Sequence, residues 1–160
     1  MVQFRLGATE RYLIWYVDDV DVLILNEEGK LLVLVDVEAL RRYATQNGLK
    51  LATAKPTWYD FDALSTWLEM PAAQSIDPSA FLNAWNLFGD VRSSLIGRST
   101  VRDPDGGSRI YEKLFRTNNL PSVAPRGVSC EPDWTEADIR DLVRVPGDGL
   151  QLFRSALARE

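Results

Sequence analysis

Three aspartates near the N-terminus are the residues whose types and spacing best suit catalytic chemistry. Asp18, Asp19 and Asp21 lie close together, and Asp36 and Glu38 follow them in the sequence. Clustered carboxylates supply the hard oxygen ligands that Mg²⁺ and Ca²⁺ prefer, and in a strand Asp19 and Asp21 would project to the same face. A simpler interpretation is that Asp18 and Asp19 separate two strands, while Asp21 faces solvent at a sheet edge, where charge blocks unwanted pairing. We prefer the simpler interpretation, and we predict no metal site.

The rest of the sequence lacks the residues of the common catalytic sites. The chain has no histidine and one cysteine, which excludes Ser-His-Asp and Cys-His systems, an intrachain disulfide and, in practice, a structural zinc site. Cys130 precedes Glu131, whose carboxylate disfavours a reactive thiolate. The sequence also has no glycine-rich phosphate-binding loop. We therefore predict no cofactor and a function that is not enzymatic.

A run of acidic residues marks a second candidate surface. It comprises Glu131, Asp133, Glu136, Asp138 and Asp141. Carboxylates in the first turn of a helix favour the positive end of its dipole, and this accounts for Glu136 and Asp138. Glu131 and Asp133 lack such a local explanation. The run is interpreted either as a solvated face or as an acidic patch that meets a basic partner.

Two neighbouring aromatic residues, Trp58 and Tyr59, fall in a connection after Pro56. Aromatic side chains in loops are common hot spots at protein interfaces. The alternative is that they pack locally against the core. We keep both residues as candidates for contact with a partner.

Composition restricts the partner. The chain of 160 residues is 46% hydrophobic and carries 18 basic against 23 acidic residues, a net charge of −5. It has the usual size of one domain, and we expect a single domain over residues 1–160. A net negative charge disfavours nucleic acid and anionic membranes as partners, whereas a basic protein remains compatible. Because the chain has no signal-peptide pattern and no apolar run long enough to span a bilayer, we expect it in the cytoplasm.

The N-terminal part is rich in strand signals. Residues 12–17, 20–25 and 31–35 combine aromatic and β-branched side chains, which suit a pleated sheet, and short links favour an antiparallel meander. The apolar third segment is predicted to be covered on both faces.

Helices are expected in the remainder of the chain. Asp36, Asp60 and Asp77 are placed as N-caps, and Thr135 opens a capping box with Asp138. The expected helices cover residues 37–46, 61–69, 78–96, 110–116, a segment from 136 that Pro146-Gly147 interrupts, and 150–158. Strands grouped before helices favour an α+β fold, with an N-terminal antiparallel β-meander packed against several helices.

The overall sequence resembles bacterial immunity proteins, the small cytoplasmic proteins that neutralise polymorphic toxins, including those of contact-dependent growth inhibition systems. The resemblance covers roughly residues 10–157. It rests on the aromatic strands and on Tyr59-Asp-Phe-Asp62, Phe81-Leu-Asn-Ala-Trp-Asn-Leu-Phe88, Tyr111-Glu-Lys-Leu-Phe115 and Asn119-Leu-Pro121. It implies stoichiometric binding to a cognate toxin domain, such as a basic nuclease, with no catalytic residues to carry over.

We therefore expect an immunity protein or a comparable protein inhibitor. Two alternatives remain at this stage: an enzyme that uses carboxylates and a divalent metal, and a non-catalytic adaptor subunit of a larger assembly. The candidate partner-binding residues are Asp18, Asp19, Asp21, Trp58, Tyr59, Glu131, Asp133, Glu136 and Asp138.

Overall fold

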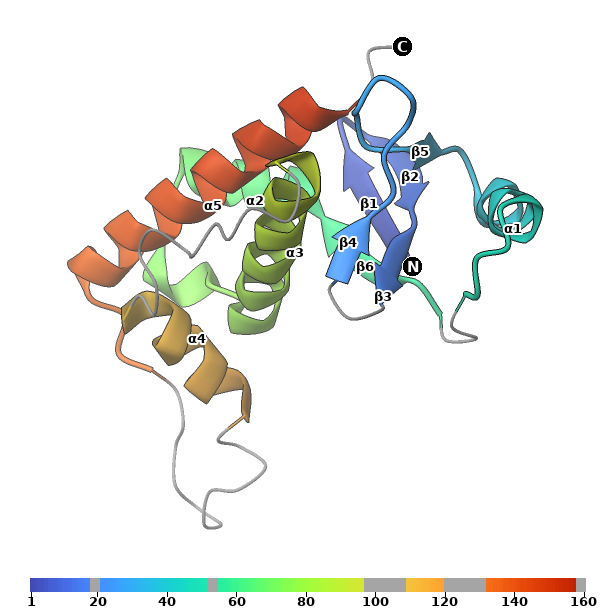
Figure 1. The fold of residues 1–160 in the computed structure, drawn as a ribbon. Helices are drawn as coiled ribbons and strands as arrows, with labels where there is room; N and C mark the ends of the chain where they lie inside the picture. Colours follow the sequence, from blue (N-terminus) through green and yellow to red (C-terminus); the bar gives the residue numbers. More distant parts are fainter. Residues whose placement is uncertain (18–20, 52–54, 97–108, 120–131, 158–160) are drawn as a thin grey trace.

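A computed structural model shows an α+β fold in which two small sheets adjoin a group of helices (Figure 1). It describes residues 1–17, 21–51, 55–96, 109–119 and 132–157. The described elements are β1 (Val2–Leu6), β2 (Thr9–Leu13), β3 (Trp15–Val17), β4 (Asp21–Leu23), β5 (Val33–Leu34), α1 (Val37–Gln46), β6 (Thr57–Asp60), α2 (Phe61–Glu69), the short 3₁₀ helix η1 (Ala73–Ser75), α3 (Pro78–Ile96), α4 (Arg109–Asn119) and α5 (Glu136–Ala156). The predicted fold class is confirmed.

The main sheet has the strand order β5-β2-β1-β6. β2 pairs antiparallel with both β1 and β5, whereas β6 pairs parallel with β1. β1 was not predicted, although Val2 and Phe4 are buried and alternate with polar residues in the period of a half-buried strand. The parallel strand β6 was not predicted either, so the sheet is mixed rather than a pure antiparallel meander.

The three predicted strand segments contact one another, but they do not form the predicted simple meander, because the third segment (β5) pairs with the first (β2) as well as contacting the second. The Ile24 amide donates to the Ile14 carbonyl over 3.2 Å, and the Leu32 amide donates to the Ile24 carbonyl over 2.9 Å. The first segment is divided at Ile14 between β2 and β3, and β3 pairs with β4 as a separate two-stranded sheet. The third segment is not covered on both faces, because β5 is a two-residue edge strand and Val35 is 65% exposed.

The first three long helices begin and end where the sequence predicts. Asp36, Asp60 and Asp77 accept backbone amides of the helical turns that follow them, which satisfies donors that a helix leaves unpaired. After α1, Gly48 adopts a φ of +66°, the left-handed conformation that glycine permits at a helix end.

The C-terminal helices differ from the prediction. Thr135 and Asp138 form the predicted capping box, but α5 continues through Pro146 without the expected interruption. α5 packs extensively against α3, and Pro146 is itself buried, so tertiary packing compensates for the lost backbone hydrogen bond. α4 is longer than predicted. Phe115 in this helix is 51% exposed.

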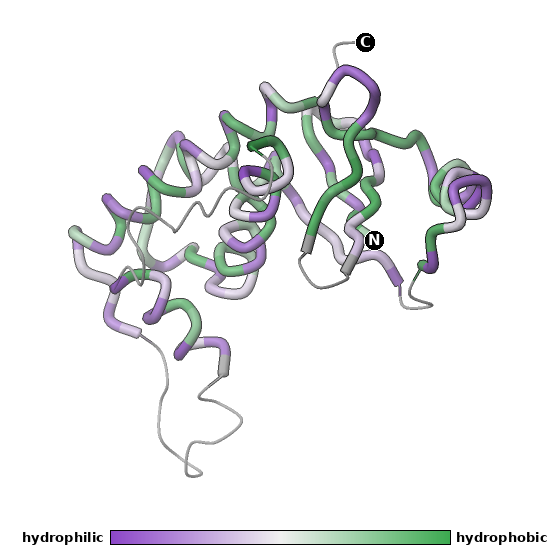
Figure 2. The backbone as a smooth tube through the Cα atoms, in the orientation of Figure 1, coloured by the Kyte–Doolittle hydropathy of each residue, from purple (hydrophilic) through white to green (hydrophobic). Residues whose placement is uncertain are grey.

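Four phenylalanines from the sheet and three helices form the centre of the core. Phe153 of α5 contacts the rings of Phe4, Phe61 and Phe88 at centroid distances of 5.1, 4.8 and 6.1 Å. Hydrophobic and hydrophilic residues alternate along the helices (Figure 2), and the buried hydrophobic residues of helices and strands form one core cluster. α1 lies apart from the other helices, beyond β2 and β5 (Figure 1).

Within the described ranges, no helix combines the length and the apolar character required to cross a membrane.

Candidate functional site

An open groove of about 400 Å³ lies beside β6 and is the candidate functional site. Its walls come from β6, the first turns of α2, η1 and the first two turns of α3. These elements are adjacent in the sequence from residue 58 to residue 84, so one continuous stretch of chain builds the groove. Its volume lies in the range of ligand pockets in proteins.

The β6 wall of the groove presents residues from both faces of the sheet. Tyr59 is only 5% exposed and points toward the core with its register partner Phe4. Trp58 and its register partner Gln3 lie on the opposite face, where the Trp58 residue is 43% exposed. Trp58 is thus an aromatic residue held at the rim of the groove by the register of a sheet.

The opposite wall is aromatic and rigid. Trp67 and Phe81 are both buried and meet edge to face, with ring centroids 4.7 Å apart. The indole N–H of Trp67 donates to the Ala72 carbonyl over 3.2 Å, which ties α2 to the segment that leads into α3. Aromatic rings fixed in this way offer a preformed surface to an apolar side chain.

Two helices begin at the groove, and each is capped by an aspartate that lines it. Asp60 Oδ1 accepts the Ala63 amide over 2.9 Å. Asp77 Oδ1 accepts the amides of Ser79 and Ala80, each over 3.0 Å. These two aspartates are the charged residues among those that line the groove, so its polar rim is acidic.

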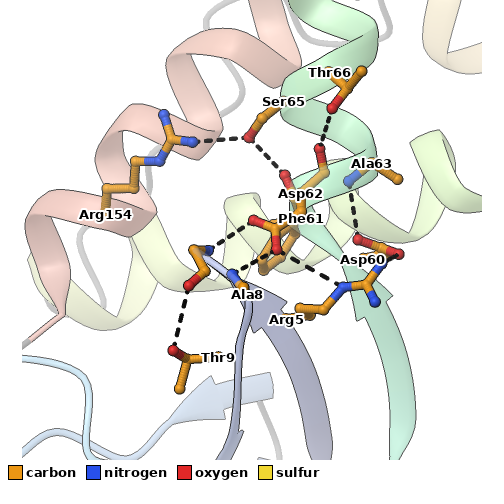
Figure 3. A network of polar contacts seen from close by, with 11 residues as sticks. Arg5, Ala8, Thr9, Asp60, Phe61, Asp62, Ala63, Ser65, Thr66 and Arg154 are labelled. Carbon is orange, nitrogen blue, oxygen red and sulfur yellow. Dashed lines mark hydrogen bonds and ion pairs between the residues drawn. The ribbon is translucent and has the colours of Figure 1, made fainter.

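Arg5 fixes the β6 end of the groove. Its guanidinium forms an ion pair with Asp60 and lies 5.9 Å from the centroid of the Trp58 ring. A second, longer contact of 3.8 Å joins it to Asp62 (Figure 3). Because Arg5 is the register partner of Asp60, the sheet itself places the cation beside these groups.

Asp62 anchors the β1–β2 turn to the first turn of α2. Its carboxylate accepts the Gly7 amide over 2.7 Å and the Ala8 amide over 2.9 Å (Figure 3). Gly7 and Ala8 have φ values of +61° and +59°, so both consecutive amides point at one anion. The hydrogen bond from Ala8, with further contributions from Gly7 and Arg5, lowers the pKa of Asp62.

Tyr59 is unsuited to proton transfer. Burial, together with the charge of Asp90, raises the pKa of its phenol to about 12. The hydroxyl is therefore protonated at neutral pH. The Tyr59 side chain packs in the core, so the prediction that it is an exposed contact for a partner is corrected, although the residue lines the groove.

Asp138 is also not a surface contact. Its side chain has no exposed area and pairs with Arg109 over 2.8 Å and with Lys113 over 2.6 Å. Burial opposes its ionisation, but hydrogen bonds from Lys113 and Thr135 outweigh burial and lower the pKa to about 2. The prediction of Asp138 as a partner-binding residue is corrected, because this carboxylate joins α4 to the start of α5.

The other acidic candidates are dispersed. Glu136 is exposed, with a 3.9 Å ion pair to Arg140, and Asp133 is also exposed. Asp18, Asp19, Glu131 and Cys130 lie outside the described residues, as does the side chain of Asp21. Within the described part of the chain, no group of acidic or cysteine side chains is arranged to hold a metal ion.

The sequence indicated Trp58 as a candidate contact for a partner, but it did not indicate the groove beside this residue. Asp60 and Asp77 were predicted only as helix caps, and Trp67 and Phe81 were not predicted to line a site. The available indication was the concentration of aromatic residues and capping aspartates within residues 58–81. No family model matches the chain, and neither the curated proteins nor the solved structures that were searched include a similar one.

Proposed function

We propose that this protein is a cytoplasmic immunity protein, which neutralises a cognate toxin domain by stoichiometric binding and not by catalysis. The single observation that carries the proposal is the groove beside β6, which is lined by aromatic residues and has the half-exposed Trp58 at its rim. Grooves with fixed aromatic walls and an exposed tryptophan are typical of protein-binding sites. The sequence resemblance supplies the class of partner.

The acidic character of the chain supports a basic toxin domain as that partner. The net charge is −5, and Asp77, which lines the groove, forms no ion pair with the described residues, whereas the other lining aspartate, Asp60, is paired with Arg5. Charge complementarity of this kind accelerates encounter and disfavours wrong partners. A basic nuclease domain fits this requirement.

The test is co-expression with the toxin domain encoded beside this gene. We expect rescue of growth and a one-to-one complex by light scattering. Rescue without a complex, or a complex without rescue, would contradict neutralisation by binding. The catalytic activity of the toxin, measured with increasing amounts of this protein, is expected to reach zero at equimolar ratio.

Replacement of Trp58 by alanine probes the groove directly. We expect Trp58→Ala to weaken the complex at least about tenfold, because tryptophan is enriched among the residues that carry most of the binding energy of protein interfaces. Val35→Ala is the matched control, since Val35 is a large exposed hydrophobic residue away from the groove. Titration calorimetry measures both affinities. Equal affinities for the two variants would remove the groove from the interface.

A further inference from the structure

The outer edge of β6 is an unpaired sheet edge among the described strands. β6 ends the strand order β5-β2-β1-β6 and pairs with β1 on one side only. The Thr57 amide donates to the Met1 carbonyl over 3.1 Å, so it points toward β1. Because successive residues of a strand direct their amide and carbonyl groups to opposite sides, those of Trp58 point away from β1.

The groove follows this edge. Trp58, Tyr59 and Asp60 all line it, although they are consecutive residues of one strand. Side chains alternate between the two faces of a sheet, so a groove on one face would contact only alternate residues. A groove that contacts three consecutive residues runs along the edge, between the β6 backbone and the wall formed by α2 and α3.

The charge of the groove specifies the side chains of its occupant. Asp77 Oδ1 accepts two backbone amides, while Asp77 Oδ2 has no partner among the described residues. Lysine and arginine are absent from the residues that line the groove. An occupant with a basic side chain near the start of α3 and an apolar side chain against Trp67 and Phe81 would complement both the charge and the aromatic wall.

We propose that an extended segment of the partner protein adds to the outer edge of β6 as the next strand of the main sheet. It pairs with the Trp58 amide and carbonyl, places an apolar side chain in the groove and directs a lysine or arginine to Asp77. Strand addition at an exposed edge is a recurring mode of peptide recognition, in which main-chain hydrogen bonds provide affinity and pockets provide specificity. This inference rests on the proposed function and specifies how that interface is made.

Hydrogen exchange in the complex with the toxin domain tests the inference. We expect exchange of the Trp58 amide to slow at least about a hundredfold on binding, as for an amide in a sheet interior. The Ala39 amide in α1, which lies away from the groove, is expected to exchange at the same rate in both states. If the complex forms and the Trp58 amide is unchanged, strand addition is overturned while the immunity function stands. If no complex forms, both are overturned.

A pair of variants separates the backbone of Trp58 from its side chain. Trp58→Ala removes the ring but keeps the outward amide, whereas Trp58→Pro removes both, and an outward amide at an edge is not needed for the fold. We expect Trp58→Pro to bind at least about tenfold more weakly than Trp58→Ala, and Asp77→Asn to weaken binding several-fold. Equal affinities of the alanine and proline variants, with both folded by circular dichroism, would contradict pairing through this amide.

Discussion

At the scale of single residues, Asp138 is the one buried charged residue among those that the structure describes. Its carboxylate has no exposed area and meets two cations, Lys113 and Arg109. Lys113 also lies 5.0 Å from the centroid of the Trp134 ring. A buried carboxylate is tolerated only when its charge is compensated, so this cluster joins α4 to α5 through mutually dependent groups.

Replacement of this carboxylate by an amide is expected to destabilise the fold. Asp138→Asn keeps the shape but leaves Lys113 and Arg109 without their anion. Because both cations are partly exposed, we expect a loss of about 2 kcal/mol, below the roughly 3 to 5 kcal/mol of a fully buried pair. Urea denaturation measures the free energy of unfolding. Glu136→Gln is the control, because the Glu136 side chain is 95% exposed and surface pairs contribute less than about 1 kcal/mol. A smaller loss for Asp138→Asn than for the control would refute this role.

The lowered pKa of Asp138 makes this contribution dependent on pH. The carboxyl has a pKa of about 2 in the folded protein, below its ordinary value of 3.8. A depressed folded pKa contributes stability that is present above the unfolded value and is lost as pH falls toward the folded value. The difference in stability between wild type and Asp138→Asn should therefore be constant near neutral pH and shrink between about pH 4 and pH 2. Denaturation curves across this range measure it, and a pH-independent difference would contradict the assignment.

At the scale of elements, the contact between α3 and α5 depends on a glycine. A Cβ added at Gly149 would lie less than 3.0 Å from three atoms of the Phe88 side chain. Phe88 is itself buried in the aromatic core, against Phe61 and Phe153. The ring cannot retreat without disturbing that core, so the absence of a side chain at residue 149 sets how closely the two helices approach.

Alanine substitutions at the two glycines of α5 should have opposite effects. Gly149→Ala is expected to destabilise the fold by about 1 to 3 kcal/mol through overpacking. Gly147→Ala is expected to stabilise it by up to about 1 kcal/mol, because the added Cβ meets nothing within 4 Å and alanine favours a helix. Thermal denaturation of both variants tests this, and a stabilised Gly149→Ala variant would show that the helices separate easily.

The sequence predicted best those elements whose boundaries are determined locally. Asp36, Asp60 and Asp77 cap their helices within three residues of sequence, and the corresponding helices were predicted with the observed bounds. Pro146 misled the prediction because its local cost is offset by packing against α3, which is distant in sequence. β6 was not predicted because it also depends on contacts distant in sequence: its pairing with β1 joins residues more than fifty positions apart.

The candidate site was predictable only in part. Trp58 was selected because an aromatic residue in a connection often serves an interface. The groove, however, forms only when β6, α2 and α3 have packed together. Which of its side chains a partner can contact depends on which of them the fold buries. Tyr59 and Asp138 illustrate this, because the sequence offered them as contacts and the fold buries both.

At the scale of the whole molecule, the sheet and the helical group meet at the aromatic core, and the groove lies where the edge of the sheet adjoins the helices. Arg5, Asp60 and Asp62 secure the joint between β1, β6 and α2 (Figure 3). The proposed binding surface is therefore supported by rigid elements on both sides. A preorganised surface loses little conformational entropy on binding, which favours tight association.

The net charge of −5 acts over the whole molecule and leads to a prediction about kinetics. If the partner is basic, their mutual attraction accelerates encounter, and salt screens it. We expect the association rate constant to fall at least about tenfold between about 50 and about 500 mM salt, with little change in the dissociation rate constant. Surface plasmon resonance separates the two constants.

A charge variant refines this prediction. Glu136→Lys reverses an exposed charge. At the same salt concentration, its association rate constant should be lower than that of the wild type and its dissociation rate constant unchanged, because long-range charge steers the encounter while contacts in the groove hold the complex. Glu136→Gln should lie between this variant and the wild type, since it changes the net charge by half as much. An effect of salt confined to dissociation would instead mean that short-range ion pairs within the interface, rather than the overall field of the protein, carry the electrostatic contribution.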